Sequence, residues 1–165
     1  MMANKSKSRI ILVGKAAAGK DHLRHILEGR GFKYGVSYTT RPPRKGEVDG
    51  IDYFFIDENE FRDLIDQKFF YEHVTFNGWY YGTSKDQWYE TDDVFIMTPS
   101  GVRKLHAADR KHSFIIYIDI PIEIRRERLG GRKDLNDAIE RRIQADENDF
   151  IGFTDYDIKL TDHNF

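Results

Sequence analysis

The 165-residue sequence contains no cysteine, which excludes disulfide bonds, thiolate zinc sites and cysteine nucleophiles. Its six histidines form no HxxxH or HExxH pair, so nothing in their spacing indicates a structural metal site. The formal net charge is only −2, and this balance provides no bulk attraction to nucleic acid or to an anionic membrane. No apolar run approaches membrane-spanning length. We therefore expect neither a membrane nor a nucleic acid as a partner.

The first nine residues, MMANKSKSR, are polar and basic. They lack the apolar segment of a secretory signal peptide, so we expect a flexible lead-in to a cytoplasmic protein. Hydrophobic residues make up 39% of the chain, which is a globular composition. A chain of this length suffices for one domain with a single substantial core.

Short apolar runs alternate with helical patterns along the chain. Buried strands are predicted at 10–13, 94–98 and 114–118, with a last short strand at 156–160. Helices are predicted at 21–29, at about 102–108, and over a charged stretch at 122–149 that is interrupted near Gly130-Gly131. This alternation predicts an α/β fold with a parallel sheet and helices on both faces.

A polar insert separates the first two core strands and is expected to form a small subdomain. It contains a predicted strand at 53–56, a predicted helix at 60–67 and an aromatic, β-branched stretch at 69–81. Asn77-Gly78 within that last stretch predicts a β-hairpin. Pro99-Ser100-Gly101 is expected to end the second core strand before the next helix.

The stretch GKAAAGKDHL follows the first apolar run directly. Gly14, Gly19 and Lys20 fit the pattern G-x-x-x-x-G-K, in which backbone N–H groups and a helix N-terminus cradle phosphates. A preceding strand and a following helix are the context that such a loop requires. The alternative is a plain glycine-rich turn between strand and helix.

Asp21 stands where a phosphate loop normally carries Ser or Thr as a Mg²⁺ ligand. A carboxylate is a hard oxygen ligand that suits Mg²⁺. It also brings negative charge close to the phosphates, so it is compatible with binding only if the metal lies between them.

Arg41 and Arg44 lie three residues apart in a loop stiffened by two prolines. Two preset guanidinium groups suit a phosphate monoester, because each can donate two parallel hydrogen bonds to it. The alternative is a solvated basic loop.

Three segments of the insert, in order, resemble the guanylate kinase family. The stretch SYTTRPPRKGEVDGIDY at 37–53 is similar to the family's nucleotide-binding insert, FFYEH at 69–73 to its F-[IL]-E segment, and NGWYYGTS at 77–84 to its G-x-Y-Y-G-[ST] segment. With the phosphate loop and the charged helical stretch, the resemblance covers roughly residues 10–160. The G-K-D ending of the loop is also similar to that of phage deoxynucleotide kinases and of animal-type phosphomevalonate kinases.

The resemblance implies one P-loop kinase domain over residues 1–165. Its core would comprise 9–36, 91–121 and 146–165, with a mixed β/α nucleotide-binding insert at 37–90 and a helical lid at 122–145. Mg²⁺ is the implied cofactor, ATP and GMP or dGMP are the implied partners, and we expect a monomer or homodimer.

The resemblance also assigns site residues. The ATP phosphates would contact Gly14, Lys15, Ala16, Ala17, Ala18, Gly19, Lys20, Asp21 and His22, with Asp21 as metal ligand. The acceptor nucleotide would contact Ser37, Arg41, Arg44, Tyr53, Glu72, Tyr81, Thr83 and Thr98. In this set Glu72 would accept hydrogen bonds from guanine N1–H and N2–H₂, and Thr83 would donate to O6.

Lys20, Arg132 and Arg142 match catalytic cations of the family. Phosphoryl transfer builds negative charge on the equatorial oxygens, which positioned cations neutralise. The lid stretch also alternates acids with its arginines, so for most of these arginines the alternative is a surface helix crossed by salt bridges.

The sequence departs from the family pattern at the second core strand. Where the family has L-D-I-D-x-x-G, this chain reads FIMTPSG at 95–101, so both carboxylates are missing. We hypothesise that Asp21 supplies the missing negative charge from the loop. The leading interpretation is a guanylate kinase-like enzyme. A broader deoxynucleoside monophosphate kinase and a catalytically inactive nucleotide-binding module are the alternatives.

Overall fold

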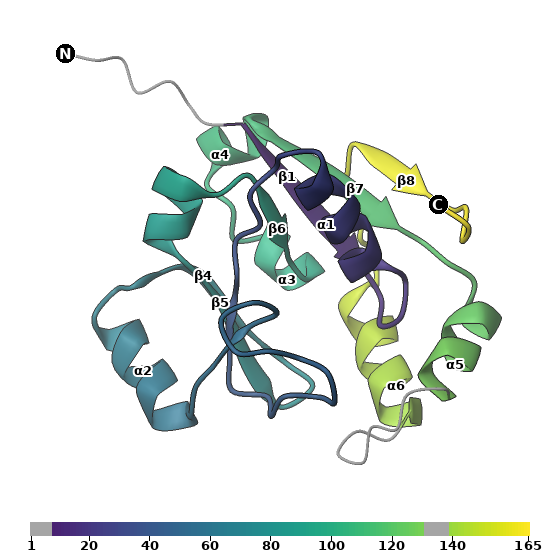
Figure 1. Ribbon diagram of the computed structural model, residues 1–165, viewed down its shortest axis with the longest axis horizontal. Coiled ribbons are helices and arrows are strands. Elements are labelled where there is room, and N and C mark those ends of the chain that lie inside the picture. Colours follow the sequence, from purple (N-terminus) through teal and green to yellow (C-terminus); the bar gives the residue numbers. More distant parts are fainter. Residues whose placement is uncertain (1–7, 131–138) are drawn as a thin grey trace.

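A computed structural model describes residues 8–130 and 139–165 (Figure 1). In chain order its elements are β1 (Arg9–Gly14), α1 (Lys20–Gly29), β2 (Tyr38–Thr39), β3 (Phe54–Phe55), α2 (Glu58–Asp66), β4 (Phe70–Phe76), β5 (Trp79–Ser84), the π-helix η1 (Gln87–Thr91), β6 (Val94–Ile96), α3 (Pro99–Val102), α4 (Ala107–Lys111), β7 (Ser113–Ile118), α5 (Ile122–Gly130), α6 (Ile139–Asp149) and β8 (Ile158–Leu160). Within these ranges no helix has the length and apolar character needed to cross a membrane.

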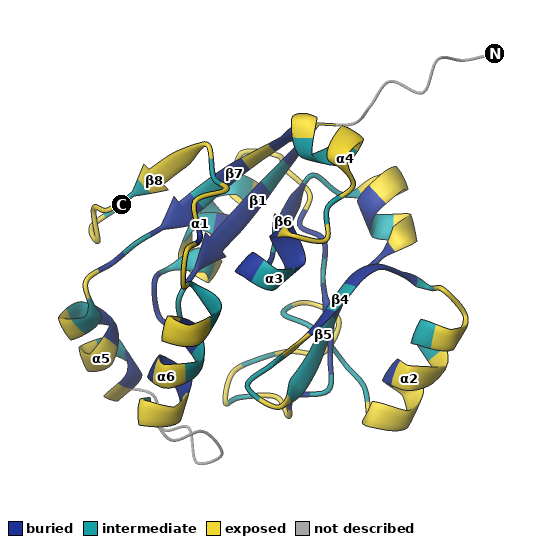
Figure 2. Ribbon diagram, turned by 180° about the vertical axis from the view of Figure 1, so that it is seen from behind, coloured by how far each residue is buried: buried dark blue, intermediate teal, exposed yellow. Residues whose placement is uncertain are grey.

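The core is a four-stranded sheet in the order β6-β1-β7-β8. All of its neighbouring strands are parallel, which confirms the predicted sheet type. The central strand β1 is buried on both faces: Ile11 and Val13 join one apolar cluster, and Leu12 joins the other. Figure 2 shows most of β1 in dark blue, the colour of buried residues. Burial on both faces explains why the strand reads as an uninterrupted apolar run.

Helices cover each face of this sheet. Leu23 and Leu27 of α1 pack against the face that carries Leu12, whereas Val102 of α3 and Phe153 pack against the opposite face. The amphipathic spacing that predicted α1 is thus used to cover a buried strand.

A second sheet, in the order β3-β2-β5-β4, lies beside the core (Figure 1). Strands β4 and β5 form the predicted hairpin, and their turn residues Asn77 and Gly78 have φ of 51° and 81°. Positive φ at both central residues is the geometry that Asn-Gly favours. Helix α2 begins at a capping box in which Asp57 accepts from the Glu60 backbone N–H and Glu60 accepts from that of Asp57.

The helix predicted at about 102–108 is wrong. Strand β6 does end before Pro99-Ser100-Gly101, as predicted, but these three residues belong to a helical turn. The structure instead has α3 over Pro99–Val102 and α4 over Ala107–Lys111. Thr98 caps α3, because its hydroxyl accepts a hydrogen bond from the Gly101 N–H at 3.1 Å. Proline at the first helical position is compatible with this start. A residue there makes no hydrogen bond within the helix through its backbone nitrogen, so the N–H that proline lacks is not missed.

The domain boundaries predicted from the resemblance stay predictions. The boundary expected between residues 145 and 146 falls inside α6, which runs as one helix over Ile139–Asp149. The expected lid includes residues 131–138, which lie outside the described residues.

Candidate functional site

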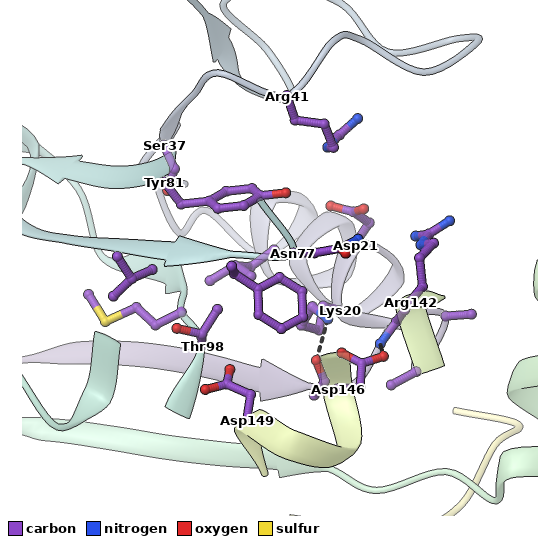
Figure 3. Close-up of a pocket in the computed structure, with 18 of the residues that line it drawn as sticks. Lys20, Asp21, Ser37, Arg41, Asn77, Tyr81, Thr98, Arg142, Asp146 and Asp149 are labelled. Atoms are coloured by element: carbon purple, nitrogen blue, oxygen red, sulfur yellow. Dashed lines mark hydrogen bonds between the residues drawn. The ribbon is translucent and has the colours of Figure 1, made fainter. Parts of the chain in front are cut away.

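A cavity of about 330 Å³ is lined by the β1–α1 loop, by the second sheet and by helices α5 and α6 (Figure 3). Most of the site residues predicted from the sequence line it: Gly14, Ala16, Ala17, Ala18, Gly19, Lys20, Asp21, His22, Ser37, Arg41, Arg44, Tyr53, Glu72, Tyr81, Thr98 and Arg142. The fold therefore brings the phosphate loop to the same cavity as the arginines and tyrosines of the insert, Arg41, Arg44, Tyr53 and Tyr81.

Three predicted residues are not part of this lining. The ammonium group of Lys15 pairs with Glu147 at 2.9 Å, so its side chain is held on α6. Thr83 is almost fully buried and donates its hydroxyl hydrogen to Glu72 Oε1 at 2.6 Å. Arg132 lies outside the described residues.

The β1–α1 loop has the strained backbone that an anion-binding turn needs. Gly19 has φ of +108° and Ala17 has φ of 62°, both in the left-handed region that side chains with Cβ rarely adopt. Lys20 donates to the backbone carbonyls of Gly14 and Lys15. The loop thus curls around its own lysine at the N-terminus of α1, where backbone N–H groups are left for an anion.

Asp21 lies in the first turn of α1 and lines the cavity. Its side chain is 72% exposed, and its Oδ1 lies 3.6 Å from Nη1 of the buried Arg24. It therefore has an accessible carboxylate beside the loop. Its role as a metal ligand stays a prediction.

A carboxylate that the sequence analysis did not single out orders the arginine loop. Glu47 accepts two hydrogen bonds from the Arg41 guanidinium, at 2.8 and 2.9 Å, and one from the Arg44 backbone N–H at 2.7 Å. Burial lowers the pKa of Arg41, but the hydrogen bonds to Glu47, together with the electrostatic effects of Tyr81, Glu47 and Tyr53, outweigh it and raise the pKa above its ordinary value. The Arg41 guanidinium also lies over the Tyr53 ring, 5.2 Å from its centroid.

The two tyrosines of the predicted phosphate clamp, Tyr53 and Tyr81, have ring centroids 6.1 Å apart. Burial raises the pKa of both hydroxyl groups. Each therefore stays protonated at neutral pH and is able to donate a hydrogen bond into the cavity.

Glu72 is a buried carboxylate at the wall of the same cavity, with only 7% of its surface exposed. Burial raises its pKa to about 7, although the hydrogen bond from Thr83 and the charge of Lys104 act in the opposite direction. Gly101 leaves room for it, because a Cβ at that position would stand 3.1 Å from Glu72 Oε2. The site therefore holds a carboxylate poised between its charged and neutral forms.

Helix α6 contributes two carboxylates that the sequence analysis missed (Figure 3). Asp146 Oδ2 accepts from the Ala16 backbone N–H at 2.9 Å. Asp149 Oδ1 accepts from the Ser100 hydroxyl at 2.7 Å, and in the described part of the chain its buried Oδ2 has no hydrogen-bond partner. In a charged stretch such as this one, no local signal separates these two acids from solvated ones.

Arginines of α5 and α6 also reach the loop. Arg128 donates to the Ala17 carbonyl at 2.9 Å and lines the cavity. Arg142 is buried and lines it as well. Helices α5 and α6 therefore bring two arginines to the cavity and its β1–α1 loop.

Among the residues that the structure describes, no three His, Cys, Asp or Glu side chains gather closely enough to form a metal cage. Mg²⁺ does not require one, because it is usually held by one or two carboxylates, waters and substrate phosphates. The orphaned, buried oxygen of Asp149 and the accessible carboxylate of Asp21 fit that mode of binding.

A parallel sheet whose first strand leads through a glycine–lysine loop into a helix defines an α/β protein of the P-loop class. Residues 6–165 match the family model described as guanylate kinase. The chain belongs to the guanylate kinase family.

Curated relatives agree with this assignment. The chain is 32% identical over 164 residues to a protein named guanylate kinase from Nostoc sp., covering 94% of this chain and 82% of that protein. It is 35% identical over 158 residues to one from Bacillus anthracis, covering 89% and 77%. The crystal structure of guanylate kinase from Anaplasma phagocytophilum superimposes with a TM-score of 0.70 at 23% identity, covering 96% of this chain and 78% of that one, and so shows the same fold.

Proposed function

We propose that this protein transfers the γ-phosphoryl group of ATP to GMP or dGMP in the presence of Mg²⁺, giving ADP and GDP or dGDP. The family and the names of the relatives support this activity. The observation that carries the proposal is the one cavity lined both by the phosphate loop and by Arg41, Arg44 and Glu72. Such a cavity lets two phosphate-bearing ligands face one another.

On the acceptor side, Arg41 and Arg44 would grip the monophosphate, with Tyr53 and Tyr81 as neutral donors. Glu47 supports this role, because it holds the Arg41 guanidinium in a fixed plane. Ionised Glu72 would accept from guanine N1–H and N2–H₂. Adenine would instead present an acceptor at N1, and two acceptors facing each other in a buried site are costly.

Thr83 and Thr98 complete the acceptor set. Thr83 donates to Glu72, so it orients the carboxylate; contact with guanine O6 would require its hydroxyl to rotate. Thr98 lines the cavity beside the start of α3, and Ser37 lines it as well. These assignments follow the family resemblance.

On the donor side, the loop from Gly14 to His22 would hold the ATP phosphates, with Lys20 reaching the β- and γ-phosphates. Asp21 and Asp149 are the residues that would hold Mg²⁺, which supplies charge neutralisation and alignment of the phosphates when it is bound. Arg142 of α6 lines the same cavity, and Arg132 remains the second predicted lid arginine.

The transfer of the phosphoryl group requires little proton transfer. An oxygen of the acceptor phosphate forms a bond to the γ-phosphorus of ATP, while the bond from that phosphorus to the β–γ bridging oxygen breaks and ADP leaves. Because the attacking oxygen is already an anion, no general base is needed. Lys20 and Arg142 would neutralise charge on the transferring group, and closure around the cavity would exclude water.

The test is an ADP-release assay with ATP, Mg²⁺ and each of GMP, dGMP, AMP, CMP, UMP and dTMP. Turnover with GMP or dGMP alone supports the proposed specificity. Turnover with other bases would indicate the broader deoxynucleoside monophosphate kinase. Saturable GMP binding without turnover would indicate an inactive binding module, the alternative favoured by Ile96 and Thr98 at the positions of the family's strand carboxylates.

A further inference from the structure

Asp146 is a buried carboxylate that lies among cations of the phosphate loop and of helices α5 and α6. Only 4% of its surface is exposed, and it lines the cavity. Its Oδ2 lies 2.9 Å from the Ala16 nitrogen and 3.9 Å from Arg125 Nη1. The charges of Lys20 and Arg142 also act on it. Figure 3 shows it directly beside Lys20.

This placement has an electrostatic consequence for any phosphate that enters the loop. A metal-free nucleoside triphosphate would bring several negative charges toward the Asp146 carboxylate, and like charges repel strongly where water is excluded. A nucleotide that carries Mg²⁺ brings fewer net charges and a cation that the carboxylate attracts. The same side chain therefore opposes one form of the ligand and favours the other.

We propose that Asp146 makes the phosphate cavity select the Mg²⁺ complex of the donor nucleotide over the metal-free nucleotide. The proposal rests on the proposed placement of the donor phosphates in the β1–α1 loop. Asp146 is a positioning and selectivity residue in this scheme, since it acts on the phosphates through charge. Asp149 lies one helical turn further along α6 and extends the negative wall.

Glu140 provides a control on the same helix. It carries the same charge, and it accepts a hydrogen bond from the exposed Arg126. Unlike Asp146 it is 73% exposed, and neither it nor Arg126 is part of the cavity lining. Glu140→Gln therefore removes one negative charge from α6 without changing the charge inside the cavity.

The experiment measures binding of the β,γ-imido analogue of ATP by titration calorimetry, once with excess Mg²⁺ and once with a chelator. The wild-type protein should bind the Mg²⁺ complex more tightly. Asp146→Asn should tighten binding of the metal-free analogue and lower the ratio of the two dissociation constants by about tenfold, as expected for one unit of charge at short range. Glu140→Gln should leave that ratio unchanged.

A folded Asp146→Asn protein with the wild-type ratio would overturn the proposal, and so would an equal fall of the ratio in Glu140→Gln. Asp146→Ser, which keeps an acceptor for the Ala16 N–H, is a second variant should the first not fold. Equal affinities of the wild-type protein for both forms would overturn the proposal without any variant. Failure of the wild-type protein to bind either form would overturn the proposed donor site itself, which separates the two failures.

Discussion

Replacing Glu72 by glutamine changes the charge of a buried side chain and almost nothing of its shape. The amide oxygen can still accept the hydrogen bond that the Thr83 hydroxyl now donates at 2.6 Å. The variant loses the negative charge, for which burial is unfavourable. We expect it to be more stable than the wild-type protein at pH 8 and much less active.

The magnitude follows from the pKa. Burial raises the pKa of Glu72 from 4.5 to about 7, and each pKa unit corresponds to about 1.36 kcal/mol. Keeping the carboxylate charged in the folded protein thus costs roughly 3 kcal/mol at pH 8. The folded state binds the proton more tightly than the unfolded state, so this cost is absent below pH 4.5 and grows as pH rises toward 7. The new buried N–H group of glutamine offsets part of the gain, about 1–2 kcal/mol.

The assay is urea unfolding of both proteins at pH 5 and at pH 8. The difference in the free energy of unfolding should move in favour of the glutamine variant by about 2 kcal/mol between these two pH values. Glu90→Gln, at an exposed position, is the control and should show no such change. A difference that stays constant with pH would refute the reasoning, because the charge of Glu72 would then cost nothing to bury.

The same variant tests the proposed guanine readout. The carboxamide would present a donor where guanine also presents donors, and the expected loss in kcat/KM for GMP is about 10²–10³-fold. In the wild-type protein the KM for GMP should rise as pH falls below 7, because protonated Glu72 cannot accept both hydrogen bonds. Equal kcat/KM values for the wild-type protein and the variant would remove Glu72 from the base-binding set.

Three further changes test the rest of the site. Asp21→Ala should abolish Mg²⁺-dependent ADP release and leave GMP binding measured by calorimetry intact, so retained turnover would exclude it as the metal ligand. Glu47→Ala removes the bidentate partner of Arg41 and should weaken GMP binding by about tenfold or more; unchanged affinity would argue against the phosphate clamp. Gly19→Ala places a Cβ at φ of +108° and 3.0 Å from the Phe165 ring, and urea unfolding should show a loss of about 1–3 kcal/mol. Unchanged stability would mean that the loop relaxes freely.

The elements that the sequence predicted well are those whose cause is local. The run at 10–13 predicts β1 because a strand buried on both faces needs apolar residues at every position. Asn77-Gly78 predicts its hairpin because few other pairs adopt positive φ twice in succession. At Pro99 the local signal was misread. Proline after a strand is compatible with a break, but it also fits a first helical turn, and the Thr98 cap decides for the helix.

The parts of the site that escaped prediction depend on contacts far apart in the chain. Asp146 and Ala16 are separated by 130 residues, and Ser100 and Asp149 by 49. In a stretch rich in acids and arginines, only the packing of α6 against the loop identifies the acids that face the cavity. Glu47 is different, because it lies only six residues from Arg41. It belongs to the insert segment that resembles the family, but its sequence position alone did not indicate that it pairs with Arg41.

The cavity contains carboxylates next to the cations on which phosphate binding depends. Glu47 holds Arg41 through two hydrogen bonds, and Asp146 lies in the field of Lys20. An incoming phosphate would meet cations that these carboxylates already hold in place. Because the cations are oriented before the ligand arrives, less side-chain entropy is lost on binding. This preorganisation is the reason that Glu47→Ala is expected to weaken GMP binding, although the substitution removes a negative charge that competes with the phosphate for Arg41.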